Sequence, residues 1–271
     1  MNPIGVFDSG YGGLTVLRNI LESMPQYDYV YLGDNARAPY GTKDFNTVYE
    51  YTLQAVRKLF GMGCPLIILA CNTASAKALR TIQQHYIANE CPGNRVLGVI
   101  RPTAEIIGQF THTGHIGIFA TPGTIKSESY KLEIEKFYPH CVVTGLACPE
   151  WVPLVESGKY NSPEADEKIS VQIDHLLSID KDIDTIILGC THYPFLYDKI
   201  RRFCPDHIRL ISQGEYIAES LKDYLSRHAD MEKRISKGST CTYFTTDSAD
   251  KVSQKASVFL NDNIKFNTID L

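Results

Sequence analysis

Two cysteines in this chain each end a short apolar run. Cys71 follows LIILA, and Cys190 follows TIILG. Such runs are typical of strands that are buried on both faces, as in a parallel sheet. A helical pattern follows each cysteine, with Asn72 or Thr73 as the expected cap of the first helix and Pro194 suited to the first turn of the second. Each sulfur is therefore expected near a helix N-terminus, where the dipole lowers the pKa of a thiol.

Two thiols on opposite walls of a cleft can invert a carbon stereocentre. One removes a proton as a thiolate, and the other donates a proton to the opposite face as a thiol. With an ordinary pKa of about 8.5, only roughly 3% of a thiol is ionised at pH 7, so neighbouring groups must assist. Asp8, at the end of an apolar run, could accept a proton beside Cys71. His192 could act as a base for Cys190 or, when protonated, stabilise its thiolate.

Hydroxyl side chains follow several of the expected strands in the same way. Together with backbone amides at helix starts, they could hold carboxylates without an arginine. Each residue taken alone is more often a buried filler, a cap or a turn residue. Their coincidence at strand ends, where open α/β sheets bind ligands, favours a functional site. These hydroxyl residues are Ser9, Thr73, Thr121, Thr124 and Thr191.

Alternating strand and helix patterns predict an α/β fold with mainly parallel sheets. The order of strand, polar turn and helix that starts at Ile4 begins again at Ile116, and a strand ending in cysteine follows at a similar distance in both cases. This repeat predicts two pseudo-symmetric lobes with the active site in the cleft between them. A surface loop is expected over 226–240 and a last helix over 252–260. Strands are expected at 4–7, 29–32, 66–70, 96–100, 116–119, 141–146, 185–189 and 242–246.

No cofactor or metal site is expected. A dinucleotide fingerprint that starts at Gly10 would need a glycine where the chain has Thr15. Asp34 could imitate a ribose-binding acid, but a loop that brings Asp8 to the sheet edge is the better interpretation. Residues 112–115 contain two histidines whose spacing suits a turn rather than a metal pair on a helix. A Schiff-base lysine for pyridoxal phosphate is not evident either.

Composition excludes several classes of protein. The 271 residues are 44% hydrophobic and 21% charged, with a formal net charge of −4, so a nucleic-acid partner is not expected. No run has transmembrane length, and the N-terminus lacks the pattern of a signal peptide. A cytoplasmic protein without membrane contact is therefore expected. The other cysteines are expected to be free and structural: Cys64, Cys91, Cys141, Cys148, Cys204 and Cys241.

Seven motifs resemble the glutamate racemase family and follow its order along nearly the whole chain. They are DSGYGGL at 8–14, GDNARAPYG at 33–41, CNTASA at 71–76, GVI at 98–100, ATPGT at 120–124, VPLVE at 152–156 and GCTHYP at 189–194. The resemblance implies cofactor-independent interconversion of L- and D-glutamate, which supplies D-glutamate for peptidoglycan. It also implies a first lobe of residues 1–98 plus 211–271 and a second of 99–210, and it is compatible with a homodimer.

The resemblance also implies roles for single residues. Cys71 would take the proton from D-glutamate and Cys190 the proton from L-glutamate, with Asp8, Glu156 and His192 assisting. The positions expected to contact substrate are Asp8, Ser9, Pro39, Tyr40, Gly41, Asn72, Thr73, Thr121, Thr124, Thr191 and His192.

Two stretches depart from the family pattern. Arg101 follows Gly98-Val99-Ile100 where many relatives carry another residue, often glutamate, and Ser212-Gln213-Gly214 stands where an aspartate–serine pair is usual. The chain also lacks the N-terminal extension of relatives that a peptidoglycan precursor activates, so such control is not expected.

Three other functions remain open from the sequence. The first is a racemase for aspartate or another acidic amino acid, which a comparison of the turnover of L-glutamate and L-aspartate would distinguish from a glutamate racemase. A Cys–His hydrolase, with His192 as the base, would form an acyl-enzyme but leaves the second cysteine strand unexplained. A two-lobed binding protein for small acids would bind glutamate and leave its α-hydrogen unexchanged in heavy water.

Overall fold

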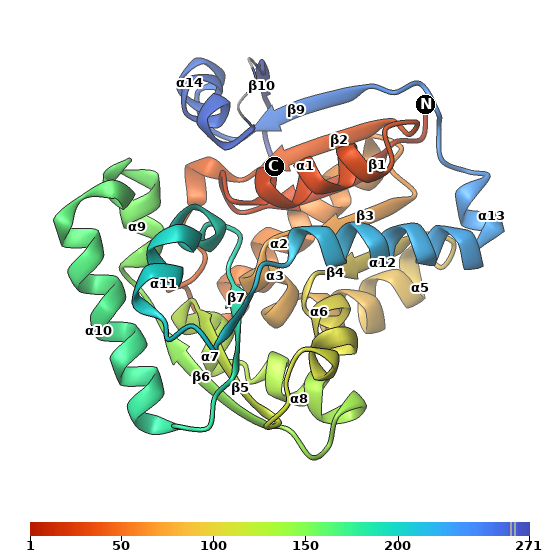
Figure 1. Cartoon of the computed structure of the whole chain (residues 1–271). Helices are drawn as coiled ribbons and strands as arrows, with labels where there is room; N and C mark the ends of the chain where they lie inside the picture. Colours follow the sequence, from red (N-terminus) through yellow and green to blue (C-terminus); the bar gives the residue numbers. More distant parts are fainter. Residues whose placement is uncertain (261, 263) are drawn as a thin grey trace.

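The computed structural model describes residues 1–260, 262 and 264–271. The chain forms two lobes, each built around a parallel sheet with helices on its faces (Figure 1). Among the described residues the first sheet has six strands in the order β10-β9-β2-β1-β3-β4, and the second has four in the order β6-β5-β7-β8. Neighbouring strands run parallel throughout both described sheets. The predicted α/β fold is confirmed.

The strands match the predicted positions closely. Each of the eight predicted strands is present, whereas the short strands β8 and β10 lie where none is predicted. The bounds are β1 Ile4–Asp8, β2 Tyr29–Gly33, β3 Leu66–Leu69, β4 Arg95–Gly98, β5 His115–Ala120, β6 Val142–Ala147, β7 Thr185–Gly189, β8 Arg209–Ile211, β9 Cys241–Thr245 and β10 Phe266–Thr268.

The two sheets repeat one plan. In each, the first strand in the sequence lies between the second and the third, and the fourth follows the third, giving β2-β1-β3-β4 and β6-β5-β7-β8. Cys71 comes shortly after β3 and Cys190 directly after β7, so the two cysteines occupy equivalent places. The carboxyl ends of parallel strands meet at one edge of a sheet, which is where open α/β sheets place their ligands. The predicted pseudo-symmetric lobes are confirmed.

The chain crosses between the sheets twice. It leaves the first sheet after β4 through helix α6 (Ile100–Ile106), and it leaves the second after β8 through helix α12 (Gly214–Arg227). The final strands β9 and β10 join the first sheet beside β2. The predicted strand 96–100 is wrong at its end, because β4 stops at Gly98 and Ile100 starts α6. Pro102 lies in the first turn of that helix, where its missing N–H costs no hydrogen bond.

Side chains cap the starts of some helices. Asp44 accepts a hydrogen bond from the Thr47 amide at the start of α2, and Ser162 does the same for α10. The predicted loop over 226–240 is wrong in part, because it contains α13 with buried Met231. The remaining bounds are α1 Gly13–Ser23, α2 Phe45–Gly61, α3 Asn72–Lys77, α4 Leu79–Thr81, α5 Ala88–Glu90, α7 Pro122–Lys126, α8 Ser129–Phe137, α9 Trp151–Glu156, α10 Pro163–Ile179, α11 Tyr197–Phe203, α13 Ala229–Glu232 and α14 Ala249–Leu260.

Aromatic packing supports the segment that carries Cys190. The fully buried Trp151 lies with its ring centroid 4.9 Å from Phe119 on β5 and 4.9 Å from Tyr193, which follows the cysteine. The Tyr193 hydroxyl donates to the carbonyl of Cys148 at 3.1 Å. Large buried aromatic rings contribute strongly to core stability, so this segment has little freedom to move.

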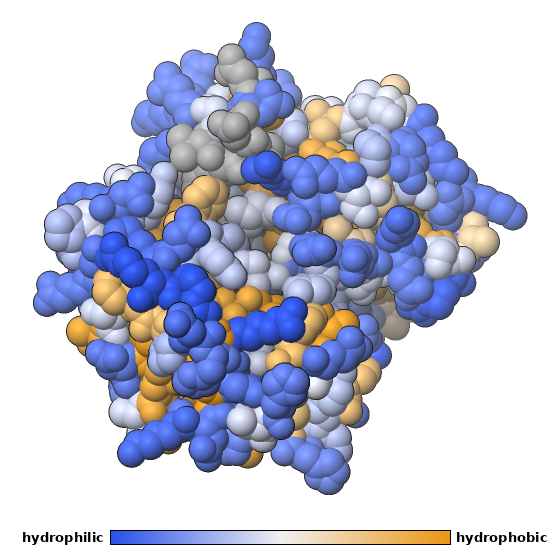
Figure 2. Space-filling model, in the orientation of Figure 1, coloured by the Kyte–Doolittle hydropathy of each residue, from blue (hydrophilic) through white to orange (hydrophobic). Residues whose placement is uncertain are grey.

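The outer surface is mixed and mainly polar. On the face shown in Figure 2, hydrophilic residues surround smaller apolar areas. Within the described part of the chain, no helix is both long enough and apolar enough to cross a membrane.

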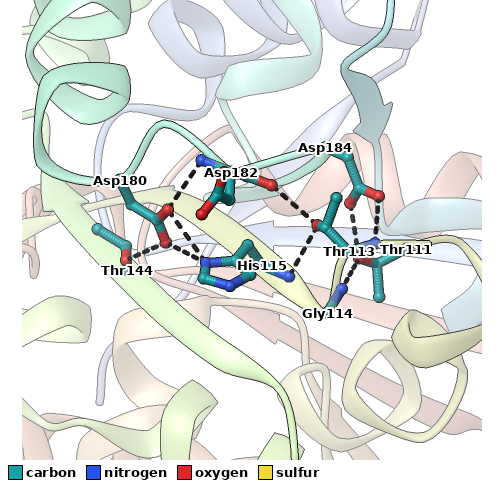
Figure 3. A network of polar contacts seen from close by, with 8 residues as sticks. All are labelled: Thr111, Thr113, Gly114, His115, Thr144, Asp180, Asp182 and Asp184. Atoms are coloured by element: carbon teal, nitrogen blue, oxygen red, sulfur yellow. Dashed lines mark hydrogen bonds and ion pairs between the residues drawn. The ribbon is translucent and has the colours of Figure 1, made fainter.

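Asp184, just before β7, forms hydrogen bonds with the turn before β5 (Figure 3). Its two carboxylate oxygens accept hydrogen bonds from the Thr111 and Thr185 hydroxyls and from the backbone amides of His112 and Thr113, at 2.6 to 3.0 Å. Burial by itself would raise the pKa of this carboxyl, but the hydrogen bonds, that from Thr111 first, lower it to about 2. The ionised form is therefore favoured in the folded protein.

Asp184→Ala is expected to lower the free energy of unfolding by about 1–3 kcal/mol at pH 7, because it leaves several donors without their acceptor. The lowered pKa means that the stabilisation is complete above the ordinary value of 3.8 and is lost as the pH falls toward 2. Urea unfolding at pH 7 and at pH 2.5 measures both effects, with the exposed Asp182→Ala as the control. A difference between wild type and Asp184→Ala that is the same at both pH values would contradict this role.

Candidate active site

Cys71 lies at the junction of β3 and α3. Its own side chain caps α3, with Sγ accepting a hydrogen bond from the Ala74 amide at 3.4 Å, so the expectation that Asn72 or Thr73 caps this helix is wrong. The Ser9 hydroxyl lies 3.4 Å from the same sulfur. The loop after β1 and the loop after β3 therefore meet at Cys71.

The Cys71 thiol is held in its protonated form. Burial first, and then the neighbouring Asp8 carboxyl, raise its pKa to about 12 against smaller opposing effects of the Ser9 hydroxyl and the Ala74 amide. The predicted lowering of this pKa is therefore wrong. The cause is that Cys71 is only 5% exposed, and the loss of water outweighs the dipole of the short helix α3. In this closed arrangement Cys71 is suited to donate a proton.

Cys190, His192 and Glu156 form a chain of polar contacts in the second lobe. Nδ1 of His192 lies 3.9 Å from Sγ of Cys190, and Nε2 lies 3.1 Å from Oε1 of Glu156. Burial lowers the pKa of His192, but the hydrogen bonds to Cys190 and Glu156 outweigh burial and raise the pKa to about 10. The ring is therefore an imidazolium at neutral pH, and it directs a proton donor toward the sulfur of Cys190.

Asp8 ends β1 with one oxygen satisfied and one free. Oδ2 accepts a hydrogen bond from the Gly10 amide at 2.9 Å. Burial raises the pKa of the carboxyl, while the positive charge of His192 lowers it. Oδ1 is buried and has no hydrogen-bond partner among the described residues. A buried acceptor without a donor costs about 1–3 kcal/mol, so this oxygen is suited to receive a donor from a ligand.

Three threonines join the lobes. The Thr73 hydroxyl on α3 lies 2.9 Å from that of Thr121 and 3.4 Å from that of Thr124, and the last two lie 3.1 Å apart. Beside them the Gly123 amide donates to the carbonyl of Gly41 at 2.8 Å. The predicted hydroxyl residues of the two lobes are therefore in direct contact.

Asp34 organises the loop that carries Pro39, Tyr40 and Gly41. It is fully buried, and its carboxylate accepts hydrogen bonds from the Arg37 side chain at 2.7 Å and from the Tyr40 hydroxyl. These internal contacts exclude a ribose-binding role for Asp34. Pro39 is exposed, and the Tyr40 hydroxyl is occupied by Asp34.

Thr191 and Asn72 flank the two cysteines. The carbonyl of Thr191 accepts a hydrogen bond from the Thr15 hydroxyl at 3.0 Å, which ties α1 to the Cys190 loop. The side chain of Asn72 bonds to Gln213 and Tyr130, two buried residues that the site prediction misses. Tyr130 carries no local signal in the sequence, and Gln213 is marked only by the departure from the family pattern at 212–214.

His115, Asp180 and Asp182 lie at the opposite end of the second sheet from Cys190. Each offers one possible metal ligand, with the three atoms within 4.8 Å of one another (Figure 3). However, Nδ1 of His115 lies 2.9 Å from Oδ2 of Asp180, and this hydrogen bond raises the pKa of His115. Nδ1 of His115 is therefore engaged by the Asp180 carboxylate, and this contact supports the start of β5.

The fold is that of a two-lobed α/β protein with one buried thiol at the equivalent strand end of each lobe. The model of the Asp/Glu/Hydantoin racemase family matches residues 4–221. Curated glutamate racemases of Dinoroseobacter shibae, 37% identical over 98% of both chains, and of Persephonella marina, 42% identical over 81% of both, are similar to this chain.

Solved structures agree with the sequence comparisons. The glutamate racemase isoform RacE1 of Bacillus anthracis has a TM-score of 0.90 at 31% identity and covers 100% of this chain and 98% of its own. The glutamate racemase of Francisella tularensis, in complex with D-glutamate, has a TM-score of 0.87 at 30% identity, covering 99% of this chain and 97% of its own. The chain belongs to the Asp/Glu/hydantoin racemase family, among the glutamate racemases, and is an amino-acid racemase.

Glu156→Gln is expected to lower the pKa of His192, because the neutral amide no longer stabilises the imidazolium. The positive charge of His192 beside Cys190 should then be lost at a lower pH than in the wild type, where the pKa is about 10. We expect roughly a tenfold loss of kcat/KM at pH 8 and a smaller loss at pH 6. A pH profile of kcat/KM and an NMR titration of the His192 ring measure this.

The matched control for Glu156→Gln is Glu150→Gln, which removes an exposed carboxylate that pairs with Lys168 just before α9. This control should keep the wild-type profile. A Glu156→Gln profile that coincides with the wild type up to pH 9 would contradict the assigned contact.

Proposed function

We propose that this chain interconverts L- and D-glutamate without a cofactor, with Cys71 and Cys190 as the two catalytic acid/base residues. The observation that supports this most strongly is the placement of one buried thiol at the equivalent strand end of each lobe. The two thiols are close enough for Cys190 to raise the pKa of Cys71. The names of the relatives support glutamate as the substrate.

In the L-to-D direction, Cys190 as a thiolate removes the proton from Cα, and the bonding pair stays on carbon as a carbanion. Cys71 then gives its thiol proton to the opposite face of Cα. The enzyme finishes with Cys190 as a thiol and Cys71 as a thiolate, which is the form that acts on D-glutamate. The different surroundings of the two sulfurs support this division, because Cys71 is held protonated and Cys190 faces an imidazolium.

The substrate groups are assigned by charge. The free Oδ1 of Asp8 accepts a hydrogen bond from the ammonium group of glutamate. Hydroxyls and backbone amides at the lobe contact hold the two carboxylates, and Glu156 acts through His192. The residues proposed to contact substrate are Asp8, Ser9, Pro39, Tyr40, Gly41, Asn72, Thr73, Thr121, Thr124, Thr191 and His192.

The wider role follows from the product. D-Glutamate supplied in the cytoplasm would serve peptidoglycan synthesis, and a homodimer is compatible with the fold. The lobes are proposed to divide as 1–98 plus 211–271 and 99–210. The crossings at α6 and α12 lie close to these bounds, with β8 of the second sheet extending to Ile211.

A circular-dichroism time course with L-glutamate tests the proposed reaction. Protein dialysed against a chelator should bring the signal to zero as the racemic mixture forms, while L-aspartate under the same conditions should change far more slowly. Activity that requires added metal or pyridoxal phosphate, or faster turnover of aspartate, would contradict the proposal. A flat signal with bound glutamate would identify a binding protein instead.

A further inference from the structure

A closed ring of hydrogen bonds lies between the two lobes. The Tyr130 hydroxyl donates to Oδ1 of Asn72 at 2.6 Å, Nδ2 of Asn72 donates to Oε1 of Gln213 at 2.9 Å, and Nε2 of Gln213 donates to the Tyr130 hydroxyl at 2.6 Å. All three side chains are at most 4% exposed. Buried rings of this kind are rigid because each member has both its donor and its acceptor satisfied.

Two members of the ring adjoin the thiols. Asn72 directly follows Cys71 and is the first residue of α3. Tyr130, on α8 of the second lobe, packs against Gly189. A Cβ added at Gly189 would lie 3.2 Å from Cε2 of the Tyr130 side chain. Gly189 directly precedes Cys190. The ring therefore connects the backbone beside one sulfur to the backbone beside the other.

Gln213 also joins the two places where the chain crosses between lobes. It is the residue before α12, the second crossing, and its Nε2 lies 3.3 Å from the carbonyl of Val99 and 3.0 Å from the Thr103 hydroxyl at the first crossing. Helix α12 runs across the middle of the molecule between the sheets (Figure 1). A single primary amide thus contacts both crossings, Asn72 beside Cys71, and Tyr130, which packs against the residue before Cys190.

From this geometry we propose that Gln213 is a positioning residue that sets the separation of Cys71 and Cys190 by fixing Asn72 against Tyr130. The inference rests on the proposed racemisation, because it concerns how the two thiols reach one Cα. Only a side chain with a donor and an acceptor at this length closes the ring. The hydrogen bonds of the Gln213 side chain go to its neighbours and not to a sulfur, so it acts through these neighbours.

Gln213→Met keeps the length of the side chain and removes every hydrogen bond, while Tyr130→Phe removes only the hydroxyl that closes the ring. We expect each to lower kcat for L-glutamate by about 10- to 100-fold with KM within about threefold, because a shift of about 1 Å in a reacting group costs rate more than binding. The double variant should be no slower than the slower single variant, because both break one ring. Thr52→Val, which removes a buried hydrogen bond within α2, is the control and should keep wild-type kcat.

A second readout does not depend on activity. Iodoacetamide labelling of Cys71 and Cys190, followed by mass spectrometry, should be several-fold faster in Gln213→Met and Tyr130→Phe and unchanged in Thr52→Val. The inference would be overturned if Gln213→Met kept the wild-type kcat and labelling rates. It would also be overturned if the losses of kcat added up in the double variant, or if Thr52→Val lost as much kcat. If Gln213→Met does not fold, Tyr130→Phe carries both readouts. A wild type that does not racemise glutamate refutes the proposed function, whereas the labelling rates still decide the role of Gln213.

Discussion

Cys71→Ala and Cys190→Ala are each expected to lose racemisation of glutamate by at least about 10²–10⁴-fold, the usual contribution of one positioned acid or base. Either variant keeps one group that can act on Cα but has no partner on the opposite face, so inversion cannot be completed. Each tenfold loss corresponds to about 1.4 kcal/mol of transition-state stabilisation. Circular dichroism with L- and D-glutamate measures the loss in both directions.

Serine variants separate the two half-reactions. A substrate that eliminates a leaving group after deprotonation needs only one base, so a variant with one thiol can still process it. Cys71→Ser, with Cys190 intact, should act on the L form, and Cys190→Ser, with Cys71 intact, on the D form. Cys64→Ser, at a buried cysteine remote from the site, is the control and should leave both activities unchanged. Two variants that process the same enantiomer, or one that racemises at near wild-type rate, would refute the assignment.

Gly12→Ala is expected to lower kcat/KM by at least about 100-fold. Gly12 has an ordinary helical φ of −57°, so the backbone accepts alanine without strain. The added Cβ would, however, lie 2.2 Å from Oγ1 of Thr191 and 2.5 Å from Nδ1 of His192. Because His192 is held by Cys190 and Glu156, the methyl group must displace the ring from the sulfur or force the lobes apart. Steady-state kinetics measures the loss of kcat/KM, and the NMR titration of His192 shows whether its ring has been displaced.

Gly61→Ala is the matched control for Gly12→Ala. Gly61 ends α2, and an added Cβ there would meet nothing within 4 Å. This variant should keep wild-type kinetics and stability within experimental error. Equal activity of Gly12→Ala and Gly61→Ala would show that the turn after β1 does not abut the Cys190 loop.

Local patterns are enough to predict eight of the ten strands in the described part of the chain. The apolar runs before Cys71 and Cys190 each form a central strand, because a strand buried on both faces leaves a continuous apolar signal. The start of α6 is less visible. Val99 and Ile100 continue the apolar run of β4, and only the position of Pro102 in the helix shows where the strand has ended.

Properties that depend on packing are beyond local sequence. The raised pKa of Cys71 follows from burial between the lobes, which a helix-start pattern does not reveal. Likewise, Tyr130 and Gln213 are 83 residues apart, and only the folded chain brings α8 and the start of α12 into contact. The hydrogen bond from the Thr246 hydroxyl to Asp34 is equally invisible to local sequence, because the two residues are 212 positions apart in the chain.

Hydrogen exchange at Cα in heavy water tests the two-base mechanism most directly. Starting from L-glutamate, the wild type should form D-glutamate that carries deuterium at Cα from the first turnovers, while the remaining L-glutamate stays protiated. This follows because Cys190 keeps the removed proton and Cys71 donates deuterium from solvent. Deuterium appearing in the L-glutamate pool as fast as in the product, or protium carried over into D-glutamate, would contradict the mechanism.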